Sequence, residues 1–388
     1  AAEQPPVVRA LIDAGADLDA RDDEDQTPLF VALLHEQLDL ARLLVEKGVD
    51  PKVEDGRGRT PLYAAVETST VEATRWLVGL GVPIHHQDEN GATPLHVAAA
   101  RGREQTISYL IGRGADVHAR DNQQRTPLHV ASKRGHILIT KALVERGADI
   151  TAKDGDGRLP VHIAAQYGHW GPTQLYVLRG VDIDVTDAAG NTPLHYAADN
   201  GQPRMAELLI ARHADICVRN ADGATPLDLV WERARTFPDV LGMTPSQIRK
   251  QRGYDATVFF LRAVVYEAYY DAIRSKHTQR IVRLVEVYPA YAHRTRFGLT
   301  PMHHAARLGY LGIVEALAKA GADIAMPAET VDGYTPLHEA AAQGRLDVVK
   351  WLLAQGAPQD APSADGRTPV QVAKAVGRDS VVRYLERN

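Results

Sequence analysis

The stretch Thr93-Pro94-Leu95-His96-Val97-Ala98-Ala99 decides the fold, because close variants of it return along the chain. A Thr-Pro-Leu triplet or a near variant begins at Thr27, Thr60, Thr93, Thr126, Leu159, Thr192, Thr225, Thr300, Thr335 and Thr368. The first six steps between these starts are 33 residues each, and the later steps are 75, 35 and 33. Self-similarity at such a period is typical of stacked repeat proteins.

The 75-residue step contains one degenerate unit. Glu267 stands where the Thr is expected, and Thr300 follows 33 residues later. Ala272, Ile281 and Leu284 then fall at apolar positions of the repeat. The chain therefore reads as eleven units, preceded by a half unit from Pro5 to Ala20.

Each unit carries the signals of two helices. Five residues after the start lies an Ala in ten of the eleven units, and Val230 is the exception. A small side chain there lets neighbouring helices approach to roughly 8 to 10 Å. The Pro after the Thr suits the first turn of a helix, and the Thr can cap it. A second apolar series then ends at a Gly in most units, which suits the left-handed residue after a helix. The residues between that Gly and the next Thr are too few for a helix and predict a hairpin loop.

At this point the sequence resembles the ankyrin repeat family, whose Thr-Pro-Leu-His-x-Ala-Ala signature is written at Thr93 to Ala99. The resemblance implies an all-α solenoid of helix pairs with projecting hairpin loops and a concave binding face. We expect a first block at 1–235 with a half unit and seven units, the last incomplete. An irregular helical insert at 236–266 and a second block of four units at 267–388 follow. Gly171-Pro172 and Tyr288-Pro289-Ala290 depart from the pattern and predict local bending or a shortened helix.

The insert does not obey the period. Thr244-Pro245-Ser246-Gln247 reads as a helix start, so Ile248 to Arg274 is expected to form one long helix, weakened at Gly253. Ten of the 19 Phe and Tyr residues lie between Phe237 and Phe297. They either fill a poorly matched junction or form an apolar site for a ligand or partner. The candidates for that site are Phe237, Tyr254, Phe259, Phe260, Tyr266 and Tyr270.

The search for catalytic and metal-binding patterns argues against an enzyme. Six His residues recur at the fourth position of the repeat: His96, His129, His162, His195, His303 and His338. Copies about 10 Å apart cannot share one zinc ion, so we expect them to brace the hairpins by hydrogen bonds. His85, His86 and His118 are expected at solvent-exposed tips. Asp154-Gly155-Asp156-Gly157 lacks the further acidic ligands of a calcium loop. No nucleophile signature occurs, and we expect no metal and no cofactor.

Composition narrows the remaining function classes. The 388 residues are 45% hydrophobic, and no apolar run is long enough to span a membrane. The single Cys217 cannot form an internal disulfide. The net charge of -5 disfavours nucleic-acid binding. The start at Ala1, without Met or a leader, predicts that an upstream segment was removed, which leaves a cytoplasmic or an exported protein open.

The positions expected to face the groove carry a local positive stripe. Arg101 to Arg134 contains seven basic and three acidic residues, against the acidic balance of the chain. The candidate partner-binding residues are Arg57, Arg59, Arg101, Arg120, Arg125, Lys133, Arg134, Lys153, Arg158 and Tyr167. Arg125, Arg134 and Arg158 are expected to be exposed. The stripe is either an ordinary solvated face or a docking site for an acidic protein or peptide. The leading prediction is a non-enzymatic module that binds a protein, and the alternative is a carrier or sensor of an apolar small molecule that uses the insert.

Overall fold

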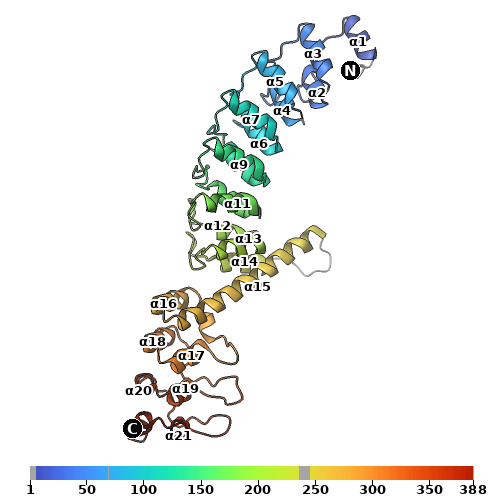
Figure 1. Ribbon diagram of the computed structural model, residues 1–388. Helices are drawn as coiled ribbons and strands as arrows, with labels where there is room; N and C mark the ends of the chain where they lie inside the picture. The colour runs from blue at the N-terminus through green and yellow to red at the C-terminus, as the bar shows by residue number, and fades with distance from the viewer. Residues whose placement is uncertain (1–5, 69, 236–244, 388) are drawn as a thin grey trace. The chain divides into compact units, whose positions relative to one another are not determined.

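The computed structural model describes residues 6–68, 70–235 and 245–387. The described residues form 22 α-helices, one short 3-10 helix and no strand (Figure 1). The chain divides into two compact units, residues 1–254 and 255–388, and each is described by itself. The boundary lies within the stretch predicted as an insert. The all-helical repeat architecture expected from the sequence is confirmed.

Seven helices of unit 1 begin at or next to the Thr-Pro-Leu triplets. The residue before six of these helices, a Thr in five and Leu159 in one, has extended backbone angles, and the Pro follows as the first helical residue. Ala98 and its equivalents are buried, and consecutive first helices pack side by side. These first helices are α2 (Pro28–Leu34), α4 (Pro61–Glu67), α6 (Pro94–Arg101), α8 (Pro127–Arg134), α10 (Pro160–Gln166), α12 (Pro193–Asp199) and α14 (Pro226–Arg235).

The second helices pack against the first ones within each repeat. They are α3 (Leu38–Glu46), α5 (Val71–Gly79), α7 (Glu104–Gly112), α9 (Ile137–Glu145), α11 (Trp170–Leu178) and α13 (Pro203–Ala211), and α1 (Pro6–Asp13) is the single helix of the described part of the half unit. The shortening expected at Gly171-Pro172 is wrong, because α11 has nine residues like α9. Pro172 is the third residue of α11, where the backbone N–H has no partner within the helix.

Hairpin turns connect one repeat to the next. In the turn at Asp88, the carboxylate accepts hydrogen bonds from the backbone N–H groups of Asn90 and Ala92, each at 2.9 Å. Neighbouring hairpins are joined through their backbones, since Glu89 N–H donates to the Arg57 carbonyl at 3.0 Å. The predicted hairpin loops are therefore present, tied both internally and to their neighbours.

Helix α15 (Pro245–Arg274) confirms the predicted long helix and begins three residues earlier than Ile248. The predicted cap, Thr244, lies outside the described residues. Gly253 has a packing role in unit 1: a Cβ there would lie 2.5 Å from the carbonyl oxygen of Gly201. Only glycine permits this approach, so the interpretation of Gly253 as a weak point of the helix is replaced by a close backbone contact.

Unit 2 repeats the same plan after the second half of α15. An apolar stripe of α15 is buried at Val258, Leu261, Val265 and Tyr269. The Tyr269 hydroxyl donates to the Leu284 and Tyr288 carbonyls at 3.0 and 2.7 Å. The remaining helices are α16 (Thr278–Val287), the 3-10 helix η1 (Pro289–His293), α17 (Pro301–Leu308), α18 (Leu311–Lys319), α19 (Pro336–Ala342), α20 (Leu346–Ala354), α21 (Pro369–Ala375) and α22 (Asp379–Leu385).

The degenerate repeat differs from the others at its end. Helix α16 has ten residues and is not shortened, and η1 takes the place of the expected Gly-Ala-Asp segment. Among the residues that the structure covers, no helix has the length and apolarity needed to cross a membrane.

Candidate functional site

Three arginines of the predicted stripe hold their own hairpins together. The side chains of Arg59, Arg125 and Arg158 each pair with an Asp four residues earlier, at 2.7, 2.7 and 2.9 Å. The Asp side chains are 1 to 2% exposed, and the Arg side chains 13 to 27%. The expectation that Arg125 and Arg158 are exposed is therefore wrong. Their guanidinium groups neutralise buried carboxylates, so the main role of these arginines is to stabilise the hairpins.

Other members of the stripe remain exposed. The Arg57 side chain is 56% exposed and lies 3.7 Å from Glu24. The Arg101 side chain is 54% exposed and pairs with Glu67 of the preceding repeat at 3.3 Å. Weak pairing of this kind leaves an arginine available to a binding partner, because exposed ion pairs contribute about 1 kcal/mol or less to stability.

Arg120 links two hairpins through backbone carbonyls. Its Nη1 donates to the Gln124 carbonyl at 3.0 Å and to the Lys153 carbonyl at 2.7 Å. Lys153 itself is exposed on the next hairpin. Both residues thus keep their charge at the surface while the backbone beneath them is fixed.

The clearest cluster of candidate residues lies in the fourth and fifth complete repeats, where the first helix of each repeat ends and the second helix begins. Lys133 Nζ lies 5.8 Å from the centre of the Tyr167 ring, a cation–π contact. Tyr167 is 43% exposed and stacks on His169, with ring centres 6.2 Å apart. Arg134 is exposed at the end of α8. The structure therefore brings Lys133, Arg134 and Tyr167 to one edge of unit 1.

A row of side chains that the sequence analysis missed fixes this edge. In five repeats the side chain ten residues after the start donates to a backbone carbonyl near the end of the previous repeat's first helix. His169 Nε2, for example, donates to the Lys133 carbonyl at 3.0 Å. The donors are Arg103, His136, His169, Arg345 and Arg378. The sequence carries a signal for this row, because all five donors are side chains with N–H groups at the same position of the repeat.

The six recurrent histidines brace the hairpins, as predicted. In His96, Nδ1 accepts from the Thr93 backbone N–H at 3.2 Å, so Nε2 carries the proton and donates to the Arg125 carbonyl at 2.9 Å. The other five histidines make the same pair of bonds. Burial lowers the pKa of each, and that of His303 to about 4. These imidazoles are neutral structural groups near pH 7.

The histidines of the second and third hairpins differ in exposure. His85 and His118 are exposed as expected, whereas the expectation for His86 is wrong. His86 is half-buried, and its Nε2 hydrogen-bonds to the Gly58 carbonyl at 2.8 Å. Throughout the described part of the chain, no cluster of three or more His, Cys, Asp or Glu residues has the arrangement of a metal site.

The aromatic candidates of the insert are mostly used inside the protein. Tyr254 and Tyr270 are 3% exposed, and the Tyr270 hydroxyl donates to the Arg294 and Leu299 carbonyls, each at 3.0 Å. Tyr266 is half-buried and donates to the Thr295 carbonyl. Phe260 is half-buried, Phe259 is 78% exposed, and Phe237 lies outside the described residues. The ligand-site interpretation of these residues stays untested.

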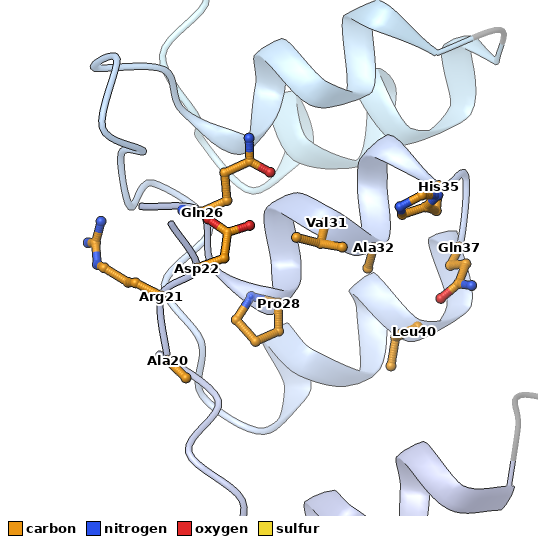
Figure 2. Close-up of a pocket in the computed structure, with 10 residues that line it drawn as sticks. All are labelled: Ala20, Arg21, Asp22, Gln26, Pro28, Val31, Ala32, His35, Gln37 and Leu40. Atoms are coloured by element: carbon orange, nitrogen blue, oxygen red, sulfur yellow. Dashed lines mark hydrogen bonds between the residues drawn. The ribbon is translucent and has the colours of Figure 1, made fainter. Parts of the chain in front are cut away.

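A shallow pocket of about 420 Å³ lies on the first complete repeat (Figure 2). Pro28, Val31, Ala32 and Leu40 contribute apolar side chains to its lining. Its polar groups are engaged within the hairpin: Arg21 pairs with Asp25 at 2.7 Å, and the Asp22 carboxylate accepts from two backbone N–H groups. The described residues that line this pocket do not converge on a common point as the groups of a ligand site do.

Comparison with known families gives matches over most of the chain. Models described as ankyrin repeats in three copies match residues 1–88 and 66–154. Models described as ankyrin repeats in many copies match residues 143–194, 176–230, 302–353 and 337–385. No curated protein matches the sequence.

Proposed function

Because the chain belongs to the ankyrin repeat family, whose repeats are generally protein–protein interaction modules, we propose that it is a non-enzymatic module that binds a protein or peptide. The proposed binding face belongs to unit 1 and carries the exposed members of the stripe. These are Arg57, Arg101, Arg120, Lys133, Arg134, Lys153 and Tyr167. An acidic partner fits this face, because arginine and lysine engage carboxylates directly.

One contrast carries this proposal. Arg59, Arg125 and Arg158 are each paired with a buried Asp, whereas Lys133 and Arg134 form no ion pair with any described residue. Lys133 is instead held over an exposed tyrosine ring. Charges that fold stability does not require are the ones that remain for a partner.

The proposal is tested by affinity capture from the native host with the wild type and a Lys133→Glu/Arg134→Glu variant. Lys141→Glu is the matched control, because Lys141 lies in the same repeat on α9, is 58% exposed and forms only a weak pair with Glu145. We expect proteins that the wild type enriches to be lost with the double variant and kept with the control. Capture should also weaken as salt rises. Equal recovery by all three proteins would contradict the proposed face.

A further inference from the structure

We propose that the partner segment combines acidic side chains with a large apolar anchor, and that it binds where the helices of the fourth and fifth complete repeats turn back. This inference rests on the proposed function and adds an apolar requirement to it. We call this surface the turn edge and define it by Lys133, Arg134, Ile137, Leu138, Tyr167 and Trp170.

Three large apolar side chains of neighbouring repeats are exposed at the turn edge. Leu138 is 59% exposed, Trp170 is 52% exposed and Ile137 is 39% exposed. Leu138 is the second residue of α9, and Trp170 is the first residue of α11. Adjacent exposed aromatic and aliphatic groups are typical of interaction surfaces, whereas single ones are ordinary.

The repeat pattern does not require these residues. At the position of Leu138, the other complete repeats and the last one have polar residues or glycine: Asp39, Glu72, Gln105, Gly171, Arg204, Gln279, Gly312, Asp347 and Ser380. At the position of Trp170, five other repeats have an aliphatic residue and none has another aromatic one; the aliphatic residues are Leu38, Val71, Ile137, Leu311 and Leu346. Since these repeats are built without an apolar side chain at the position of Leu138 and without an aromatic one at the position of Trp170, these two side chains need a reason other than stacking.

Contacts show that the turn edge is continuous across the two repeats. Gly171 packs against Ile137, because a Cβ on Gly171 would lie 3.3 Å from the Ile137 side chain. His169 donates to the Lys133 carbonyl at 3.0 Å and stacks on Tyr167. Lys133 in turn lies over the Tyr167 ring. These contacts hold Lys133, Tyr167 and Ile137 around the segment from His169 to Gly171.

The charge of the patch selects the chemistry of its occupant. Lys133 and Arg134 bring two positive charges, and no carboxylate of the described chain pairs with them. At the equivalent edge of the third repeat, by contrast, an acidic side chain, Glu104, stands close in sequence to the basic Arg101 and Arg103. Basic groups around exposed Trp and Leu complement a segment in which Asp or Glu flanks a large apolar residue. Aromatic and Arg residues are also those that most often dominate binding energy.

The test uses a short fluorescein-labelled peptide of Asp and Glu with a central Phe-Leu pair, and measures binding by fluorescence anisotropy. One control peptide has Ser-Ser in place of Phe-Leu, and another has Lys in place of every acidic residue. The protein variants are Leu138→Ser and Trp170→Ser. Leu178→Ser is the matched control, because Leu178 is 66% exposed at the opposite end of α11. Circular dichroism checks that each variant is folded.

We expect the Phe-Leu peptide to bind about tenfold more tightly than the Ser-Ser peptide, as expected for one buried anchor. Leu138→Ser and Trp170→Ser should remove this difference, and Leu178→Ser should keep it. Equal binding of the two acidic peptides, lost only on Lys133→Glu/Arg134→Glu, would overturn the anchor and leave the acidic partner standing. Failure of both acidic peptides to bind the wild type, or equal binding of the Lys peptide, would overturn both proposals.

Discussion

Replacing His303 by Gln should exchange a pH-dependent brace for a pH-independent one. His303 is fully buried, accepts from the Thr300 backbone N–H at 3.2 Å and donates to the Tyr334 carbonyl at 2.9 Å. The protein contains the replacement already: in the last repeat, Gln371 accepts from the Thr368 backbone N–H at 2.9 Å through its side-chain oxygen. His303→Gln therefore keeps the cap and removes the titrating group.

The magnitude follows from the lowered pKa. Burial shifts the pKa of His303 from 6.5 to about 4. As pH falls below 6.5 the unfolded chain binds the proton first, so stability is present above that pH and is lost toward pH 4. One pKa unit corresponds to about 1.4 kcal/mol, which gives roughly 3 kcal/mol over the full window and about 2 kcal/mol by pH 5.

The assay is urea unfolding of unit 2 at pH 7.5 and at pH 5. Trp351 is the single Trp of that unit, so Trp76, Trp170 and Trp231 are first replaced by Phe. We expect His303→Gln to be slightly less stable than its parent at pH 7.5, by about 1 kcal/mol for an imperfect hydrogen bond. At pH 5 it should be more stable by a similar amount.

The comparison isolates one residue, because His304 and His338 titrate alike in both proteins. His293→Gln is the control, since His293 is an exposed histidine of the same unit. It should leave the pH dependence of the parent unchanged. If His303→Gln loses stability between pH 7.5 and pH 5 as steeply as its parent, burial of this imidazole does not set the pH response and the reasoning is refuted.

Three further predictions concern stability. Arg158→Glu should lower the free energy of unfolding of unit 1 in urea by roughly 1 to 3 kcal/mol, because it leaves the buried Asp154 carboxylate unpaired. Arg134→Glu should change it by less than about 0.5 kcal/mol. Equal effects of the two substitutions would contradict the roles assigned to these arginines. Gly253→Ala should lower the melting temperature in calorimetry, despite the better helix propensity of Ala. Gly79→Ala is the control and should not lower it, because a Cβ at Gly79 would meet open space. A higher melting temperature for Gly253→Ala would refute the close contact. The two compact units should unfold at different urea concentrations when Trp351 is compared with the Trp residues of unit 1, and coincident curves would argue against independent units.

The period alone predicted most of the fold because each repeat packs mainly on its neighbours. The helix starts after Thr93 and its equivalents and the histidine braces follow from positions within one unit, so a sequence reading reaches them. The role of Gly253 was misread because its reason is the backbone of Gly201, far away in sequence. A local reading of a glycine within a helix gives only its propensity.

The candidate site was predicted less well than the fold. The repeat pattern predicts Arg125 and Arg134 near the groove, but it does not indicate which of them already has a partner. Arg125 follows Asp121 by four residues in a hairpin, a spacing that has no fixed meaning outside a helix. Only the folded turn brings the two side chains together, so the structure is needed to distinguish an arginine that has a structural partner from one that is available to bind.

The row of donors from Arg103 to Arg378 gives the array a direction. Each of these side chains satisfies a carbonyl of the repeat before it, so every such repeat depends on its successor for a closed helix end. Removing repeats from the C-terminal side would leave a helix-end carbonyl without its donor, whereas removal from the N-terminal side would leave a side-chain donor without its acceptor, and a side chain can turn toward water. Shortened versions of this protein should therefore tolerate trimming from one end better than from the other.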